Sequence, residues 1–322
     1  MRSETLLLIG RDTRGARETF RVHADRLADR TGIDVEIARY AEEPGRELRD
    51  RFRNIDADVT YAVPMCAAHG YDTVDAIPAA LSAIPGDVRY CDPVGTSPAT
   101  TDVIAARADA ARSRAGASTA AGRGSTDAHS DAAADPDVSL VLVAFGSSSK
   151  PHGRRMAEYH ANRLRSRSAY AEVVPCYLLQ NPAVECVRYA VTGDHIVAVP
   201  LFVSRSAATE DRIPAELELD RGGIAYGDPF GDHSRFTDAI YAEVERQRAL
   251  TAQDSEDAST DQPTDQPTDQ PTDQPTDEPN RSSMLRSSTT KPPIVTDGEG
   301  TRDSRTPPDS EDPSRFGPVD RR

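Results

Sequence analysis

One loop of the sequence combines an imidazole with carboxylates at close spacing. Residues 63–81 read VPMCAAHGYDTVDAIPAAL, in which His69 stands three residues before Asp72. Imidazole and carboxylate ligands together suit divalent metals, and an imidazole also accepts protons near neutral pH. The segment is therefore a candidate site for a divalent metal, with His69 and Asp72 as the candidate ligands. The alternative interpretation is an ordinary loop histidine beside acidic residues.

Three arginines occupy segments at or just after predicted strand ends. Arg11, Arg14 and Arg205 could bind the carboxylates of an anionic substrate, because a guanidinium pairs with a carboxylate through two parallel hydrogen bonds. The alternative is that arginine fills loops by default, since only two of the 38 Lys and Arg residues are lysines. We expect the three arginines to form a substrate clamp in an otherwise acidic protein.

The segment around His69 occurs twice in the chain. Residues 199–217, VPLFVSRSAATEDRIPAEL, repeat it at an offset of 136 positions, with Arg205 in place of His69. Residues 88–104, VRYCDPVGTSPATTDVI, correspond at the same offset to residues 224–240, IAYGDPFGDHSRFTDAI. Self-similarity at a fixed spacing indicates a duplicated domain. If one copy keeps a site and the other is its structural partner, an imidazole is needed only once.

The elements that must position these residues alternate between strands and helices in both copies. Continuous apolar runs, TLLLIG and SLVLVAFG, predict strands that are buried on both faces, and amphipathic stretches follow them. This alternation predicts parallel sheets with helices on both faces. Ligands of such sheets bind beyond the carboxyl ends of the strands, here at residues 10–15, 65–75, 146–153 and 202–211.

Composition divides the chain into four segments. The two copies occupy residues 1–107 and 138–249, and residues 108–137, rich in Ala, Gly, Ser, Thr, Arg and Asp, predict a disordered linker whose first residues could extend the preceding helix. Residues 250–322 include the repeat TDQPTDQPTDQPTDQPTDEP, in which a proline at every fourth position prevents both helix and sheet formation. The composition of this last segment predicts a disordered acidic tail.

The charge of the chain excludes some classes of partner. Its 53 Asp and Glu residues outnumber 38 Lys and Arg residues, which gives a formal net charge of −15. This acidic, lysine-poor composition resembles that of proteins from a halophilic cytosol, so we expect a cytoplasmic protein. The sequence has no basic patch for nucleic acid and no apolar run long enough to span a membrane.

The pattern VP…IPA.L followed by Y.DP.G, present in both copies, resembles the sirohydrochlorin chelatases, the CbiX/SirB group of class II tetrapyrrole metal chelatases. The resemblance implies an α/β fold of two duplicated, chelatase-like (flavodoxin-like) half-domains with a cleft between them. It also implies a lyase of cobalamin or sirohaem biosynthesis that inserts a divalent metal, Co²⁺ or Fe²⁺, into sirohydrochlorin without an organic cofactor. A partner chelatase subunit is a further partner that it implies.

This sequence departs from the family at the histidines. The resemblance places one histidine directly after the first strand and another eight residues past the proline of the Val-Pro strand. These positions hold Arg11 and Asp72 in the first copy, and Phe145 and Ala208 in the second.

Three hypotheses about function remain open. In the first, the protein is an active chelatase in which His69 is metal ligand and base, Asp72 is the second ligand, and the arginines bind the substrate. In the second, it is a non-catalytic homologue that binds a tetrapyrrole or a metal, or partners an active chelatase. The third, a periplasmic-binding-type or flavodoxin-like binding module, rests on the sheet topology alone.

Overall fold

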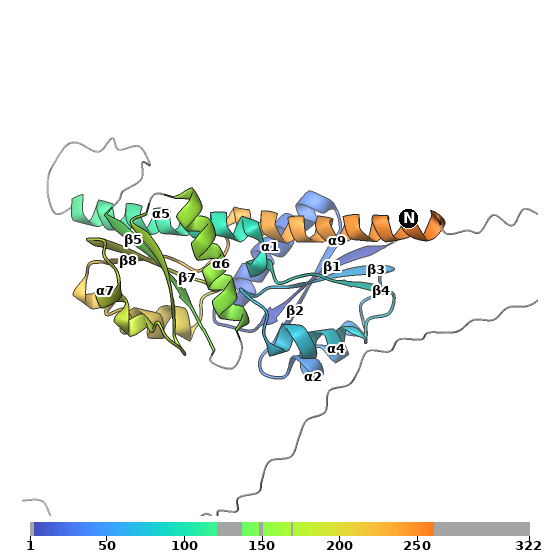
Figure 1. Cartoon of the computed structure of the whole chain (residues 1–322). Coiled ribbons are helices and arrows are strands. Elements are labelled where there is room, and N and C mark those ends of the chain that lie inside the picture. Colours follow the sequence, from blue (N-terminus) through green and yellow to red (C-terminus); the bar gives the residue numbers. More distant parts are fainter. Residues whose placement is uncertain (1–2, 121–136, 148–150, 169, 261–322) are drawn as a thin grey trace, which may run out of the picture. The chain divides into compact units, whose positions relative to one another are not determined.

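Two parallel sheets of the same topology form the framework of the protein (Figure 1). The computed structural model describes residues 3–120, 137–147, 151–168 and 170–260. The first sheet has the strand order β2-β1-β3-β4, and the second has the order β6-β5-β7-β8. The strands are β1 (Glu4–Arg11), β2 (Asp34–Tyr40), β3 (Val59–Pro64), β4 (Asp87–Tyr90), β5 (Val138–Ala144), β6 (Glu172–Tyr177), β7 (His195–Pro200) and β8 (Ile224–Tyr226). The predicted duplicated α/β fold is therefore confirmed.

Burial of the central strands explains their apolar sequences. Strands β3 and β5 are buried along their whole length, as expected where helices cover both faces of a parallel sheet. In the first sheet, Ile9 of β1 is paired with Pro64 of β3. The polar segments that follow these two strands therefore start side by side at the same edge of the sheet.

Helices cover both faces of each sheet. On one face of the first sheet, Leu48, Phe52 and Ile77 pack with Leu7 and Ile9 in a core of their own, and the second sheet has a corresponding core. In the described part of the chain, no helix is long and apolar enough to cross a membrane. The helices are α1 (Ala16–Thr31), α2 (Pro44–Glu47), α3 (Arg49–Phe52), α4 (Ile77–Leu81), α5 (Pro98–Ala120), α6 (His152–Arg167), α7 (Val187–Ala190), α8 (Ile213–Glu216) and α9 (Ser234–Thr260).

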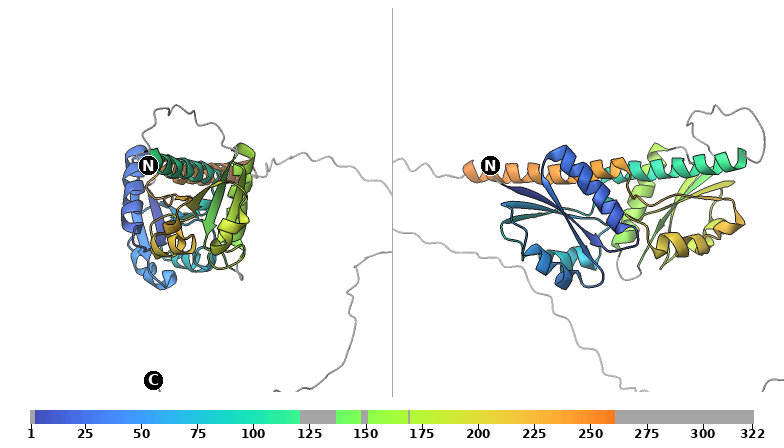
Figure 2. Two further views of the ribbon diagram at one scale, coloured as in Figure 1. Left: turned by 90° about the vertical axis from the view of Figure 1, so that its left-hand side faces the viewer. Right: turned by 180° about the vertical axis from the view of Figure 1, so that it is seen from behind.

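The last helix of each copy packs on the sheet of the other copy. Helix α5, which follows β4 in the chain, contacts β7 and β8, whereas α9, which follows β8, contacts β3 and α1 (Figure 1 and Figure 2). The two helices also contact each other. Buried residues of both sheets and of both helices belong to one continuous apolar core. The half-domains therefore exchange their last helices and share their central core.

Two buried histidines join the half-domains by equivalent contacts. His23 on α1 is hydrogen-bonded through Nδ1 to the Thr237 hydroxyl (2.8 Å) and through Nε2 to the carbonyl oxygen of Gly231 (2.7 Å). The duplicated contacts involve His160, Thr101 and Gly95. Burial lowers the pKa of each imidazole to about 4, so both rings are neutral at pH 7. A neutral ring can donate from Nε2 to the carbonyl and accept the hydroxyl proton at Nδ1.

Helices α5 and α9 extend beyond the boundaries predicted from composition. Helix α5 continues past residue 107 to Ala120, and Ala108 and Ala111 are buried. The predicted linker therefore begins too early, because the second half-domain supplies the apolar surface that this alanine-rich segment covers. Helix α9 likewise passes residue 249 and ends at Thr260. The rest of the predicted linker and tail lies outside the described residues.

Candidate functional site

Arg11 and Asp72 form an ion pair at the carboxyl ends of β1 and β3. Arg11 is the last residue of β1, and Asp72 begins a π-helical turn (Asp72–Ala76) in the segment after β3. The Arg11 guanidinium donates from Nη2 to Asp72 Oδ2 over 2.7 Å, and the Tyr40 hydroxyl donates to the same oxygen over 3.1 Å. The two family histidine positions of this half-domain are therefore adjacent, but they hold a guanidinium and a carboxylate.

Electrostatics keep this cluster in its charged, hydrogen-bonded form. Desolvation lowers the pKa of the Arg11 guanidinium, but the neighbouring Asp72 outweighs it and the net pKa lies above the usual value. Burial raises the pKa of Tyr40, and the negative charge of Asp72 raises it further, so the phenol stays protonated and remains a donor. A cation bound to Asp72 opposes metal binding at that carboxylate by direct repulsion.

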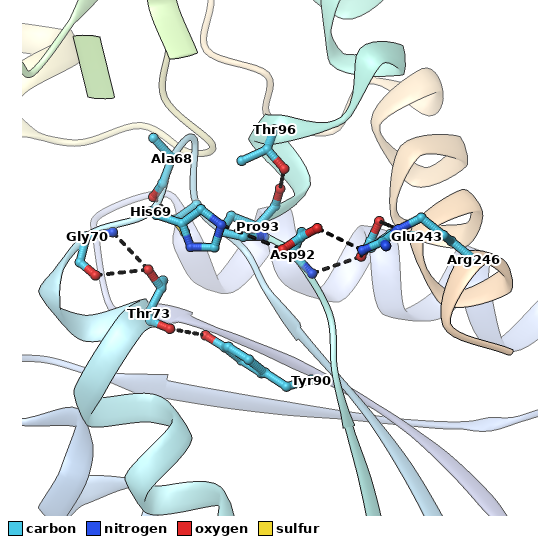
Figure 3. Close-up of polar contacts among 11 residues, drawn as sticks. Ala68, His69, Gly70, Thr73, Tyr90, Asp92, Pro93, Thr96, Glu243 and Arg246 are labelled. Carbon is cyan, nitrogen blue, oxygen red and sulfur yellow. Dashed lines mark hydrogen bonds and ion pairs between the residues drawn. The ribbon is translucent and has the colours of Figure 1, made fainter. Parts of the chain in front are cut away.

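His69 faces a carboxylate that the sequence analysis did not single out. Its Nε2 atom lies 3.6 Å from Oδ1 of Asp92, two residues beyond the end of β4 (Figure 3). Helix α9 of the other copy holds Asp92 in place: Arg246 donates to Oδ2 over 2.7 Å, and Glu243 accepts the Asp92 backbone N–H over 2.8 Å. The predicted His69–Asp72 pair is thus replaced by a His69–Asp92 pair, with Asp72 bound to Arg11.

The loop that carries His69 is fixed by its own hydrogen bonds. The Thr73 hydroxyl accepts the Gly70 N–H over 2.8 Å and donates back to the Gly70 carbonyl over 3.1 Å. The Tyr90 hydroxyl donates to the Thr73 carbonyl over 2.8 Å, as Figure 3 shows. The second half-domain repeats all three bonds with Thr209, Ser206 and Tyr226. Both loops therefore have the same frame, and differences in function reside in the side chains that they present.

An ion pair in the second half-domain is equivalent to the His69–Asp92 contact. Arg205 Nη2 lies 3.7 Å from Oδ1 of Asp228, which follows β8 as Asp92 follows β4. Arg114 from the exchanged helix α5 donates to Asp228 over 2.9 Å. Each half-domain therefore has a basic loop residue, an aspartate after its last strand and an arginine from the other copy's helix. This repetition supports a structural role for the position, and only the first half-domain fills it with imidazole.

A pocket of about 450 Å³ lies where the two half-domains meet, lined by Arg14 of the first and by residues of the second. Arg205 is among these residues, so the structure brings two of the three predicted clamp arginines together, while Arg11 is not part of the lining. Arg14 donates to Glu210 over 2.8 Å, and Glu210 and Asp228 also line the pocket. The charges of the pocket are therefore balanced before a ligand arrives.

Close backbone contact between two loops shapes this pocket. The Gly15 N–H donates to the Arg205 carbonyl over 3.0 Å, and the hydroxyls of Thr13 and Ser204 lie 2.8 Å apart. A Cβ at Gly15 would lie 2.9 Å from the Arg205 backbone nitrogen, so this approach requires glycine. The segments after β1 and β7 are thus held against each other by backbone as well as by side chains.

The family histidine positions of the second half-domain are apolar. Phe145 follows β5, is half exposed, and lies with its ring centroid 5.9 Å from that of Phe202. Ala208 and Phe202 pack at the margin of the second sheet's own core. Neither Phe145 nor Ala208 can bind a metal. Among the residues that the structure describes, no group of three or more His, Cys, Asp and Glu side chains is arranged to hold a metal ion.

Comparison with known proteins finds a family model that matches the second half-domain. Residues 139–247 match the CbiX family model. The second half-domain is therefore similar to CbiX proteins. A relative named "Probable sirohydrochlorin cobaltochelatase", from Halobacterium salinarum, is 27% identical over 241 residues that cover 66% of this chain and 76% of that protein. The predicted resemblance to the class II tetrapyrrole chelatases is confirmed. Residues 257–283, beyond the segment that matches CbiX, match the model of a PT disordered repeat.

Solved chelatase structures share the fold of this chain. SirB from Bacillus subtilis with Fe³⁺ gives a TM-score of 0.57 at 17% identity, covering 78% of this chain and 97% of SirB. CbiX, the terminal enzyme for biosynthesis of siroheme in denitrifying bacteria, gives a TM-score of 0.54 at 20% identity. The match covers 74% of this chain and 98% of that protein. DR2241 from Deinococcus radiodurans, a multi-domain protein with structural similarity to chelatases, gives a TM-score of 0.58 at 22% identity, covering 76% of this chain. This chain spans only 55% of DR2241. At these identities the likeness shows the fold.

Proposed function

We propose that this protein is a tetrapyrrole metal chelatase that inserts Co²⁺ or Fe²⁺ into sirohydrochlorin, in cobalamin or sirohaem biosynthesis. The observation that carries the proposal is the pocket at the meeting of the half-domains, where Arg14 and Arg205 converge at the carboxyl ends of the strands of a chelatase fold. Its volume is within the range of small-molecule sites, roughly 300–1,000 Å³. The relative named as a probable cobaltochelatase supports the substrate class.

The side chains would divide the reaction between substrate binding and proton removal. Arg11, Arg14 and Arg205 would bind the carboxylates of the tetrapyrrole. A substrate carboxylate that takes Arg11 away from Asp72 would free Asp72 as a metal ligand. Two pyrrole N–H protons leave as one divalent metal enters, so the charge balances, and His69 would accept these protons and pass them to solvent. The reaction as proposed requires no organic cofactor.

The acidic composition supports a proposal for the setting of the reaction. We place the protein in the cytoplasm, with the metal and the tetrapyrrole as its partners and no role for nucleic acid or membrane. A partner chelatase subunit is a further proposed partner, because one half-domain retains a polar loop while the other is apolar at the equivalent positions.

A second candidate function is favoured by the Arg11–Asp72 ion pair. In the first half-domain, the two family histidine positions hold Arg11 and Asp72, whose Nη2 and Oδ2 atoms lie 2.7 Å apart, so their charges balance. In the second half-domain, the two positions hold Phe145 and Ala208. A protein of this kind could bind the tetrapyrrole through its arginines without inserting a metal. It would then act as a carrier or as the partner of an active chelatase.

One experiment separates the two candidates. Purified full-length protein in high salt is titrated with sirohydrochlorin, followed by absorption spectroscopy, and Co²⁺ is then added. Protein-dependent formation of cobalt-sirohydrochlorin supports the chelatase, whereas saturable binding without insertion supports the second candidate. The double variant Arg14→Ala/Arg205→Ala serves as a control and should weaken binding in either case. If wild type neither binds sirohydrochlorin nor inserts the metal, both candidates are wrong.

A further inference from the structure

We propose that the second half-domain holds the flat face of the tetrapyrrole on an apolar strip formed by Phe145, Leu179 and Phe202. These residues follow β5, β6 and β7, which are neighbours in the sheet order β6-β5-β7-β8. The inference rests on the proposed function and deepens it, because it assigns the surface that binds the ring and the side chains that orient it.

The apolar strip crosses three adjacent strand ends. The ring centroids of Phe145 and Phe202 lie 5.9 Å apart at an interplanar angle of 52°. The Leu179 N–H donates to the Phe145 carbonyl over 3.0 Å, which keeps these two segments side by side. Phe202 packs against the second sheet's own core, whereas Phe145 is 50% exposed and Leu179 is 52% exposed. Phe202 therefore anchors the strip, and the other two side chains present apolar surface to solvent.

A tight turn fixes the position of Phe145. Gly146, the next residue, has a φ of 71°, in the left-handed region that favours glycine. A Cβ at Gly146 would lie 2.7 Å from the Cβ of Tyr177, which is buried at the end of β6. The turn is therefore packed directly against its neighbouring strand. A surface that is ordered in advance binds a ring at a smaller cost in conformational entropy.

The first half-domain has no counterpart of the apolar strip. Strand register and the 136-residue offset align the strip with positions that hold Arg11, Ala41 and Cys66. The fold therefore does not require large apolar side chains at these strand ends. Contiguous apolar side chains left exposed on a protein with a net charge of −15 indicate a binding surface.

An arginine borders the apolar strip. Arg205 follows Phe202 by three residues, so their Cα atoms are at most roughly 11 Å apart. Arg205 lines the pocket together with Arg14. Its Nη2 atom lies 3.7 Å from Asp228, which is longer than a hydrogen bond, so the guanidinium keeps donors for a ligand. A ligand that matches this surface has a flat apolar face and carboxylates at its rim, as sirohydrochlorin has.

The apolar strip lies at the edge where the half-domains meet. Gly15, after β1, contacts Arg205, and the ring centroid of His69 lies 6.1 Å from that of His152, the first residue of α6. A macrocycle that rests one face on the strip turns its other face toward the half-domain of His69 and Asp72. This arrangement accounts for Phe145 at a family histidine position, because the second copy then binds the ring and leaves the chemistry to the first.

Titration of the full-length protein without added metal tests the inference. The probes are sirohydrochlorin and uroporphyrin, a flat porphyrin with a similar carboxylate rim, followed by absorption and fluorescence. Phe145→Ala should weaken binding of both about tenfold, the order of effect that loss of an aromatic side chain has on a stacked planar ring. Phe145→Tyr keeps the aromatic ring and should bind as wild type does. The control Tyr189→Ala removes a side chain of α7 that is 82% exposed, and it should also bind as wild type does.

The salt dependence of binding separates the apolar strip from the arginines. Salt screens ionic contacts but not apolar ones, so Phe145→Ala should keep the wild-type dependence of the dissociation constant on salt concentration. Arg205→Ala removes an ionic contact and should flatten this dependence. Circular dichroism and the midpoint of unfolding confirm that each variant is folded. A flattened salt dependence in Phe145→Ala would contradict the inference, because the ring would then act through the arginines.

The outcomes distinguish this inference from the proposed function. If wild type binds both probes and Phe145→Ala binds them equally well, the strip does not hold the ring, and the proposed function is unaffected. If Phe145→Ala weakens binding as expected but wild type inserts no metal, the inference stands and the proposed chelatase activity fails. If wild type binds neither probe, the inference and the proposed substrate class are both wrong.

Discussion

His69 and Arg205 occupy the same position in the two copies, and each faces the aspartate that follows the last strand of its own sheet. The loop can evidently use either a guanidinium or an imidazole at this position, but only the imidazole can also bind a metal. The sequence predicted the loop and its histidine. It did not predict Asp92 as the partner, because that contact depends on how strands β3 and β4 end side by side.

Replacement of Arg11 by alanine tests the ion pair with Asp72. The two side chains are 54% and 20% exposed, so the pair contributes at most about 1 kcal/mol to the free energy of unfolding. Arg11→Ala should therefore leave the unfolding midpoint nearly unchanged while it raises the dissociation constant for sirohydrochlorin more than it lowers turnover. Arg53→Ala, which removes an exposed ion pair with Asp50 on α3, is the control. Unchanged sirohydrochlorin binding in Arg11→Ala would remove this arginine from the clamp.

The buried histidines predict a loss of stability in acid. The pKa of His23 and of His160 in the folded protein is about 4, below the ordinary value of 6.5, because burial disfavours the charged ring. Between these two pH values the unfolded chain binds more protons, so the free energy of unfolding should fall as the pH drops from 6.5 to 4, by about 3 kcal/mol per histidine. Denaturant unfolding at stepped pH measures this slope. His23→Gln/His160→Gln should flatten it, whereas His195→Gln should not; equal slopes in all three proteins would contradict the account.

At the scale of elements, the main feature is the exchange of α5 and α9. The sequence predicted that a helix follows the last strand of each copy, because the repeat is clear there. It could not show which sheet each helix covers, since the two sheets present similar apolar faces and the repeat is the same for either arrangement. The same exchange explains why composition alone predicts a linker for the alanine-rich part of α5, because the apolar partners of this segment come from the other copy.

Two truncations test the role of α9. Removal of the residues after Leu250 should leave the midpoint of unfolding unchanged, because the buried residues Phe236, Ala239, Ile240 and Val244 remain. Removal of the residues after His233 exposes the apolar surface that these side chains cover. Burial of each large apolar side chain contributes about 1.5–3 kcal/mol to the free energy of unfolding. The side chains of α9 together contribute an amount that approaches the whole stability of a typical domain. A folded, cooperative protein without α9 would show that the helix is dispensable.

At the scale of the whole molecule, the two copies form one structural unit. Their shared core and exchanged helices predict that neither residues 1–120 nor residues 137–260 fold alone, and that a mixture of the two fragments recovers helical structure. Circular dichroism of each fragment and of the equimolar mixture measures this. Fragments that each unfold cooperatively on their own would contradict the shared-core description.

The candidate site follows the same division between what sequence could and could not predict. The segments that carry Arg14, Arg205 and His69 were predicted because ligands of parallel sheets bind beyond the carboxyl ends of the strands. The direction of each strand alone determines which segments lie at that edge. The pairing of Arg11 with Asp72, the contact of Arg246 with Asp92 and the approach of His152 to His69 all depend on tertiary packing. The last two contacts form only when the two half-domains pack against each other, and no local sequence pattern predicts that packing.

The initial rate of Co²⁺ insertion into sirohydrochlorin, compared between wild type and His69→Ala, tests the central claim most directly. The assay uses full-length protein in high salt and the absorption change of the metallated tetrapyrrole, with His195→Ala as the control. The account predicts insertion by wild type and by the control, and a rate indistinguishable from the protein-free reaction for His69→Ala. Wild-type insertion that persists unchanged in His69→Ala, or no insertion by wild type, would contradict it.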